Sequence, residues 1–201
     1  MRTDSLALKI GKYIWSLAAL LLIACDAETK YNTYYPCNFV FFTNIYPSSA
    51  LTRAVNNPGE FVIVKSETRQ GVTHLILTPN HGSWAKSDVD LTMSTAIGNE
   101  RLNYNSMGAG RGLIIGRSNF YGLKAFDLQC PNCLDAFGIA KYELTWIEDG
   151  RYLQCTQCQR TYQPDNDDGI IVAGGQKGDK MLIQYRNVIY NATEGRLQVR
   201  N

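Results

Sequence analysis

Histidine and groupings of catalytic side chains are scarce in this sequence. Only two histidines, His74 and His81, occur among its 201 residues. No serine or cysteine nucleophile stands with a histidine and a carboxylate, and no pair of carboxylates stands in a context that suggests hydrolysis. The sequence therefore indicates neither an enzyme nor a small-molecule substrate.

Runs of basic residues are absent as well. The chain has 20 Lys and Arg against 18 Asp and Glu, with a pI near 8.2. Three of these basic residues, Arg2, Lys9 and Lys12, and one acidic residue, Asp4, lie within residues 1–24. Without that segment the chain carries 17 charges of each sign and is neutral. No basic run remains to follow a phosphate backbone, so we expect no nucleic-acid binding.

The apolar run near the start is short. Residues 14–24 form an apolar stretch of 11 residues, well below the ~20 that a helix needs to span a bilayer. This stretch follows a basic start and runs straight into a cysteine at residues 22–25 (LIAC). Residues 1–24 are therefore predicted to be a cleaved secretory signal.

Residues 22–25 resemble the lipobox of bacterial lipoproteins, in which the cysteine is lipidated and becomes the mature N-terminus. The resemblance implies that Cys25 anchors the protein to a bacterial membrane in the cell envelope, through an N-terminal lipid. Residues 25–37 are mostly polar, include three tyrosines and lack an apolar period. We expect them to be a flexible tether between the lipid and the folded body.

Residues 38–201 are predicted to form one all-β domain, because short β-branched and aromatic runs alternate with turn signals. A short helix is compatible with 48–55, with Ser48 or Ser49 as its N-cap. The expected strands cover 38–44, 60–65, 73–78, 112–117, 123–128, 141–147, 152–154, 170–172, 181–186, 188–191 and 196–199.

Two Cys-x-x-Cys motifs are the strongest signal for function. Cys130 and Cys133 are followed, after 21 intervening residues, by Cys155 and Cys158. A tight turn places cysteines at i and i+3 toward one centre, and two such turns offer four thiolates at the corners of a tetrahedron. This spacing predicts a site for Zn²⁺, iron or an iron–sulfur cluster, with two disulfides or free buried thiols as the alternative.

Residues 123–131 (LKAFDLQCP) and 153–158 (LQCTQC), together with Tyr162, resemble the cluster-binding part of Rieske-type iron–sulfur proteins. The resemblance implies an antiparallel β-sandwich or barrel with a small metal-loop subdomain at about 128–180. It also implies a 2Fe–2S cluster, with Pro131 and Tyr162 supporting the metal loops. A protein of this kind passes electrons to a redox protein partner, at most as a component of an oxidoreductase system.

The ligand set departs from that family, whose two loops read Cys-x-His and Cys-x-x-His. Cys133 stands one place beyond the first histidine position, and Cys158 replaces the second. Two thiolates in place of two imidazoles would lower the potential of a cluster toward about −400 mV. Zn²⁺ or a single iron suits two Cys-x-x-Cys motifs equally well. Two hypotheses follow: a lipid-anchored redox module, or a cell-envelope interaction lipoprotein with a structural zinc site.

Two further features have plain interpretations. Cys37 is the odd cysteine and is expected to be buried and inert. The acidic run 165–168 (DNDD) lacks the spacing of an EF-hand calcium loop, so we expect an ordinary solvated loop there.

Overall fold

The computed structural model describes residue 31 and residues 34–94, 96–97 and 100–201. The predicted signal at residues 1–24 and the predicted lipidation site Cys25 lie outside these residues. Among the helices of the described residues, none has the length and apolar character needed to cross a membrane.

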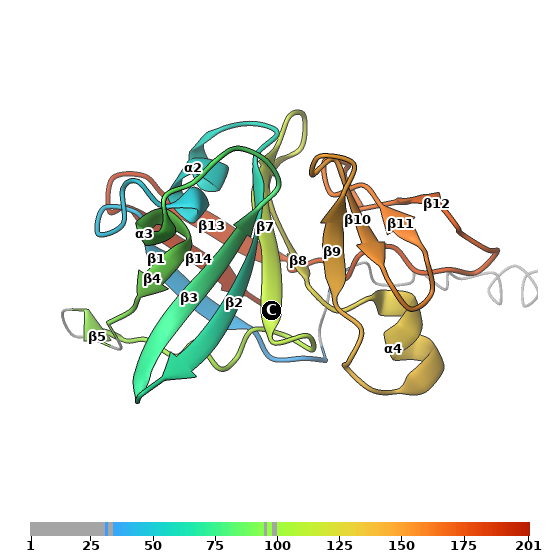
Figure 1. Cartoon of the computed structure of the whole chain (residues 1–201), viewed down its shortest axis with the longest axis horizontal. Helices are drawn as coiled ribbons and strands as arrows, with labels where there is room; N and C mark the ends of the chain where they lie inside the picture. Colours follow the sequence, from blue (N-terminus) through green and yellow to red (C-terminus); the bar gives the residue numbers. More distant parts are fainter. Residues whose placement is uncertain (1–30, 32–33, 95, 98–99) are drawn as a thin grey trace, which may run out of the picture.

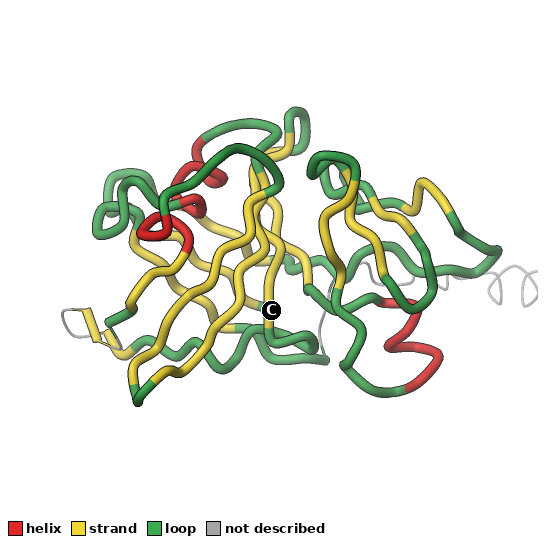
Figure 2. Tube along the Cα trace, viewed as in Figure 1, coloured by secondary structure: helices red, strands yellow, loops and turns green. Residues whose placement is uncertain are grey.

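The larger part of the molecule is a sandwich of two antiparallel sheets (Figures 1 and 2). The first sheet has five strands in the order β4-β3-β2-β7-β8, and the second has three in the order β1-β14-β13. The antiparallel all-β prediction is confirmed. The strands of the first sheet are β2 (Phe61–Arg69), β3 (Val72–Pro79), β4 (Asp90–Thr92), β7 (Gly112–Ser118) and β8 (Gly122–Asp127), and those of the second are β1 (Asn38–Phe42), β13 (Asn187–Asn191) and β14 (Arg196–Arg200).

Two short helices pack against this sandwich, and a short two-stranded sheet lies between β4 and β7 in the sequence. Helix α2 (Ala50–Asn56) begins where the Ser49 side chain accepts a hydrogen bond from the Thr52 N–H, at 3.2 Å. This N-cap confirms the short helix that the sequence allowed there. The remaining short elements are α3 (Lys86–Val89), β5 (Ala96–Ile97) and β6 (Glu100–Arg101).

A smaller sheet is inserted between β8 and β13. It contains β9 (Leu144–Ile147), β10 (Tyr152–Cys155), β11 (Thr161–Tyr162) and β12 (Ile171–Ala173) in the order β12-β11-β10-β9. Helix α4 (Pro131–Phe137) lies beside it (Figure 1). Residues 128–182 thus form an insertion with its own small sheet, from which all four paired cysteines come.

The insertion packs on the outer face of the five-stranded sheet. Because side chains alternate along a strand, Val62 and Val64 of β2 point into the sandwich core, whereas Phe61 and Ile63 join a second core with the paired cysteines. In β7, Ile114 joins this second core in the same way. Burial on both faces explains why these strands have continuous apolar runs.

Two contacts hold the β9–β10 side of the insertion against the sandwich. The Trp146 indole Nε1 donates a hydrogen bond to the Thr78 carbonyl, at 2.9 Å. The Lys65 ammonium pairs with both carboxylate oxygens of Glu143, at 3.0 and 2.8 Å. The indole bond joins the end of β3 to β9, and the ion pair joins β2 to the residue that precedes β9.

The acidic run 165–168 holds the opposite side. The Asp165 carboxylate accepts hydrogen bonds from the backbone and the side chain of Asn119, at 2.8 and 2.6 Å. The buried ammonium of Lys124 lies 2.6 Å from an Asp167 carboxylate oxygen. The loop is partly exposed, and its carboxylates also fasten the insertion to the β7–β8 hairpin, a role that the sequence did not predict.

The buried carboxylate of Asp127 organises the junction between the two parts. It accepts backbone hydrogen bonds from Ala109 (2.7 Å), Gly110 (3.0 Å) and Gln129 (2.8 Å), and one from the Tyr185 hydroxyl (2.8 Å). Burial raises the pKa of this carboxyl above its ordinary value, and the hydrogen bonds offset part of that effect. Four donors on one carboxylate fix the point where β8 ends and the insertion begins.

The returning segment was predicted as a strand over 181–186, but only isolated pairing occurs there. The Asp127 N–H donates to the Ile183 carbonyl at 2.8 Å, and the Tyr185 N–H donates to the Ala125 carbonyl at 2.9 Å. Gln184 forms single bridges with Phe126 and with Tyr31. The chain therefore leaves and re-enters the sandwich at the same edge of β8.

Replacing Gly108 should test the Asp127 junction. Gly108 has φ +78°, and a Cβ there would collide with the Tyr185 hydroxyl and the Asp127 carboxylate. Gly71 is the matched control, with φ +80° and nothing within 4 Å of a Cβ. We expect Gly71→Ala to lower the free energy of unfolding by about 1–2 kcal/mol, through backbone strain alone. Gly108→Ala should lose at least about 2 kcal/mol more, because it also disrupts buried hydrogen bonds. If chemical denaturation gave the same loss of unfolding free energy for both variants, the Asp127 junction would not have the predicted importance for stability.

Candidate metal centre

The first cysteine pair stands at the start of helix α4. Cys130 is the N-cap residue and Pro131 occupies the first helical turn, where a missing N–H has no cost. Cys133 follows in the same turn, and the Leu134 N–H donates to the Cys130 carbonyl at 3.0 Å. Both sulfurs therefore project from the first turn of helix α4. The sequence predicted an isolated tight turn at this place.

The second pair stands between β10 and β11. Cys155 is the last residue of β10, and its N–H donates to the Arg160 carbonyl at 3.1 Å. The Gln159 N–H donates back to the Cys155 carbonyl at 2.8 Å. Gln159 adopts a left-handed backbone, with φ 60°, which turns the chain sharply after Cys158.

The two turns bring four sulfur atoms together. All four Sγ atoms lie within 4.8 Å of one another. The Sγ atoms of Cys130 and Cys158 are 3.6 Å apart, and so are those of Cys133 and Cys155. A tetrahedral ion with metal–sulfur bonds of about 2.3 Å would hold its sulfurs about 3.8 Å apart. The cysteines predicted as ligands are thus positioned to bind a metal ion.

The sulfurs lie mostly inside the insertion. Cys130, Cys133 and Cys155 are at most 1% exposed, and Cys158 is partly exposed. The cysteines share their core with apolar side chains from both the insertion and the five-stranded sheet. Bulk water is therefore excluded from three of the four sulfurs.

Hydrogen bonds tie the first pair to the rest of the insertion. The Tyr162 hydroxyl lies 3.5 Å from the Cys130 sulfur and accepts a hydrogen bond from Asn132 Nδ2 at 2.8 Å. The Asn132 amide also exchanges two backbone hydrogen bonds with Lys180, each 2.8 Å long. The sequence singled out Tyr162 and the buried Pro131 but not Asn132. The position of Asn132 inside a Cys-x-x-Cys motif is the sequence feature that could have pointed to it.

An ion pair stands beside the second cysteine pair. The Arg160 guanidinium makes two hydrogen bonds of 2.7 Å to the two carboxylate oxygens of Asp179. Burial raises the pKa of Cys158, but the neighbouring Arg160, Cys130 and Cys133 outweigh it and lower this pKa to about 7. Arg160 and Asp179 are 19 residues apart in the sequence, so no local sequence pattern predicts that they pair.

Burial has the opposite net effect on the first cysteine pair. It raises the pKa of Cys130 to about 11 and the pKa of Cys133 further above its ordinary value. Without a bound cation, both groups are therefore neutral thiols at neutral pH. A metal ion supplies the positive charge that makes buried thiolates stable.

The remaining candidate ligands lie elsewhere. Cys37 is buried in the sandwich, with its sulfur 3.6 Å from the Val199 carbonyl. His74 pairs with Asp90 at 2.9 Å, and His81 lies 3.4 Å from a Glu60 carboxylate oxygen. None of these three residues belongs to the cysteine cluster.

Comparison with known proteins returns no relatives. No protein-family model, curated protein or solved structure shows a significant match to this chain.

Removing one candidate ligand should release the metal. We expect Cys155→Ser to lose bound metal and to lower the melting temperature, because the three remaining thiolates, two of them buried, would form an incomplete coordination shell. Cys37→Ser is the control, since Cys37 is also buried but lies outside the cluster. Metal analysis and thermal unfolding of both variants provide the check. Unchanged metal content in Cys155→Ser would rule out the four-cysteine site.

Metal affinity should increase with pH. Binding requires thiolates, and the raised pKa values of Cys130 and Cys133 mean that both are protonated in the metal-free protein at pH 8. Each ion bound therefore displaces at least these two protons. The logarithm of the affinity should rise by at least about two per pH unit between about pH 8 and 9. Competition with a chelator measures this slope, and a slope near zero would contradict the predicted protonation.

Proposed function

We propose that the four cysteines hold one metal ion in a closed tetrahedral site, and that this ion is Zn²⁺ in a structural role. The protein that carries it is a Rieske-like β domain, attached to a bacterial membrane through a lipid on Cys25. One observation carries the proposal for a single ion, namely the mutual approach of all four sulfurs to within 4.8 Å.

The sulfur spacing argues against a 2Fe–2S cluster. Such a cluster has two irons, each bound by its own pair of cysteines, with two sulfides between the irons. Sulfurs on different irons are therefore further apart than sulfurs on the same iron. Here all four Sγ atoms lie within 4.8 Å of one another, so neither pair is set apart as the ligands of a second iron would be. A single ion satisfies this arrangement directly.

A structural role is supported by the position of the site, which joins two separate segments of the insertion. Its ligands come from the start of α4 and the turn after β10, and the cysteines are part of the second core. Four protein ligands leave no open position for a substrate or water. Structural zinc contributes on the order of 10 kcal/mol to folding in small domains, which suits a small sheet with a limited apolar core.

The Rieske-like architecture and the lipid anchor rest on separate observations. The metal loops lie on a small sheet inserted into an antiparallel sandwich, and Tyr162 lies against a candidate ligand, as the sequence resemblance implies. The anchor rests on the lipobox-like residues 22–25. It is compatible with Tyr31, which bridges to Gln184 of the folded body six residues after Cys25.

A single iron that transfers electrons is the second candidate. The Tyr162 hydroxyl, 3.5 Å from the Cys130 sulfur, favours it, because hydrogen bonds to sulfur tune the potential of iron–sulfur centres. The partly exposed Cys158 offers a route to a redox protein partner.

Metal analysis of protein produced anaerobically, in medium containing both iron and zinc, distinguishes these alternatives. We expect colourless protein with one zinc per chain and no sulfide, because the site accommodates one ion. Cobalt exchanged into the site should give the visible spectrum of a tetrahedral thiolate complex, and the Cys155→Ser variant provides the blank. One iron without sulfide would support the second candidate. Two irons with two sulfides would overturn the single-ion proposal.

A further inference from the structure

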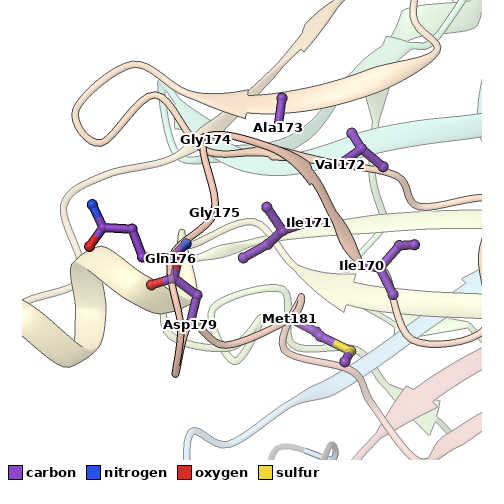
Figure 3. A pocket seen from close by; sticks show the side chains of 9 residues that line it. All are labelled: Ile170, Ile171, Val172, Ala173, Gly174, Gly175, Gln176, Asp179 and Met181. Carbon is purple, nitrogen blue, oxygen red and sulfur yellow. The ribbon is translucent and has the colours of Figure 1, made fainter.

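An open groove runs along the outer edge of the insertion (Figure 3). It has a volume of about 530 Å³ and is lined by β12, the loop that follows it, Asp179 and Met181. Val172 and Met181 are 41% and 45% exposed, and Ile170 and Ile171 are partly exposed. We call these four apolar residues the β12 shelf. Ile171 also packs against the second core, so the shelf exposes mainly Val172 and Met181.

The edge of the small sheet is open at the same place. Strand β12 is the outermost strand in the order β12-β11-β10-β9, so one of its edges has no partner strand among the described residues. Its free N–H and C=O groups need water or another polar partner. Whatever covers the shelf must therefore combine apolar groups with polar partners for this edge.

The charge beside the shelf is positive. The carboxylate of Asp179 lines the groove, but Arg160 neutralises it through two hydrogen bonds. Lys177, which follows the groove residue Gln176, is exposed. The shelf therefore presents a cation beside apolar side chains, a combination that suits the headgroups and outer acyl segments of anionic lipids.

The chain reaches the folded body on this side of the insertion. Tyr31 bridges to Gln184, and the Arg186 guanidinium lies 4.9 Å from the centre of the Tyr31 ring. Gln184 is only three residues beyond Met181 of the shelf. The six residue steps from Cys25 to Tyr31 extend to at most about 20 Å. A lipid on Cys25 thus keeps the bilayer surface close to this part of the molecule.

From the shelf, its charge and this short connection, we propose that the β12 shelf rests on the surface of the membrane that holds the lipid of Cys25. Val172 and Met181 enter the boundary between headgroups and acyl chains, while the open edge of β12 stays in the hydrated headgroup layer. Lys177 contacts anionic headgroups. This inference rests on the proposed lipid anchor and adds the orientation of the domain.

The orientation has a consequence for the metal centre. Asp179 of the groove is paired with Arg160, which stands two residues after the candidate ligand Cys158. The groove and the partly exposed candidate ligand Cys158 are therefore linked through this ion pair. The proposed contact therefore brings the metal centre toward the bilayer.

Tryptophan introduced at the shelf tests the contact in the lipid-modified chain. The protein is reconstituted in vesicles of phosphatidylethanolamine and phosphatidylglycerol that contain nitroxide-labelled acyl chains. The test variants are Val172→Trp and Met181→Trp. The control is Val72→Trp, because Val72 is 42% exposed and lies in the β2–β3 hairpin, at the far end of the molecule (Figure 1). The two native tryptophans of the body, Trp84 and Trp146, are subtracted using the parent protein.

We expect the nitroxide lipids to quench the two shelf tryptophans at least about threefold more strongly than the control tryptophan. Adding Lys177→Glu should weaken this quenching. Equal quenching at all three positions, or none, would overturn the proposed orientation.

Vesicle flotation separates this inference from the proposed anchor. The parent protein should float with the vesicles, and Cys25→Ser should not. If the parent fails to float, both the anchor and the shelf contact are wrong. If it floats but the shelf tryptophans are not quenched, only the shelf contact is wrong. Metal content, measured on the same samples, reports on the cysteine site independently of both results.

Discussion

The buried carboxylate of Asp127 is the interaction on which the arrangement of the two parts depends. It stands where β8 ends, and its oxygens collect donors from the loop before β7, from the start of the insertion and from Tyr185 on the returning segment. A buried charge is unfavourable unless it is fully hydrogen-bonded. Four donors meet that requirement, and in doing so they define how three chain segments cross.

The sequence carries the local features of this protein well. Paired Cys-x-x-Cys spacing identified the four cysteines, β-branched runs identified most strands, and Ser49 marked a helix start. The helix at Pro131 was missed because its seven residues were interpreted as a metal loop, although proline after Cys130 is a helix-start signal. The two-residue strand β11 is too short to produce any periodic pattern.

What the sequence could not supply is long-range pairing. Asp165 and Asp167 looked like a solvated turn, because their partners Asn119 and Lys124 lie more than 40 residues away. The bonds that link Asn132 to Lys180 and Arg160 to Asp179 are equally invisible to local patterns. The contacts of Asn132 and Arg160 lie beside the cysteines. The four candidate ligands were therefore predictable from the sequence, whereas the groups that position them were not.

The insertion begins and ends at neighbouring points of one strand edge, since the Asp127 N–H is hydrogen-bonded to the Ile183 carbonyl. The sandwich can therefore keep its strand order whatever lies between these two residues, provided that the ends remain adjacent. The insertion is thus one contiguous chain segment that joins the sandwich at a single place. It is not independent of the sandwich, because it covers the apolar outer face of the five-stranded sheet.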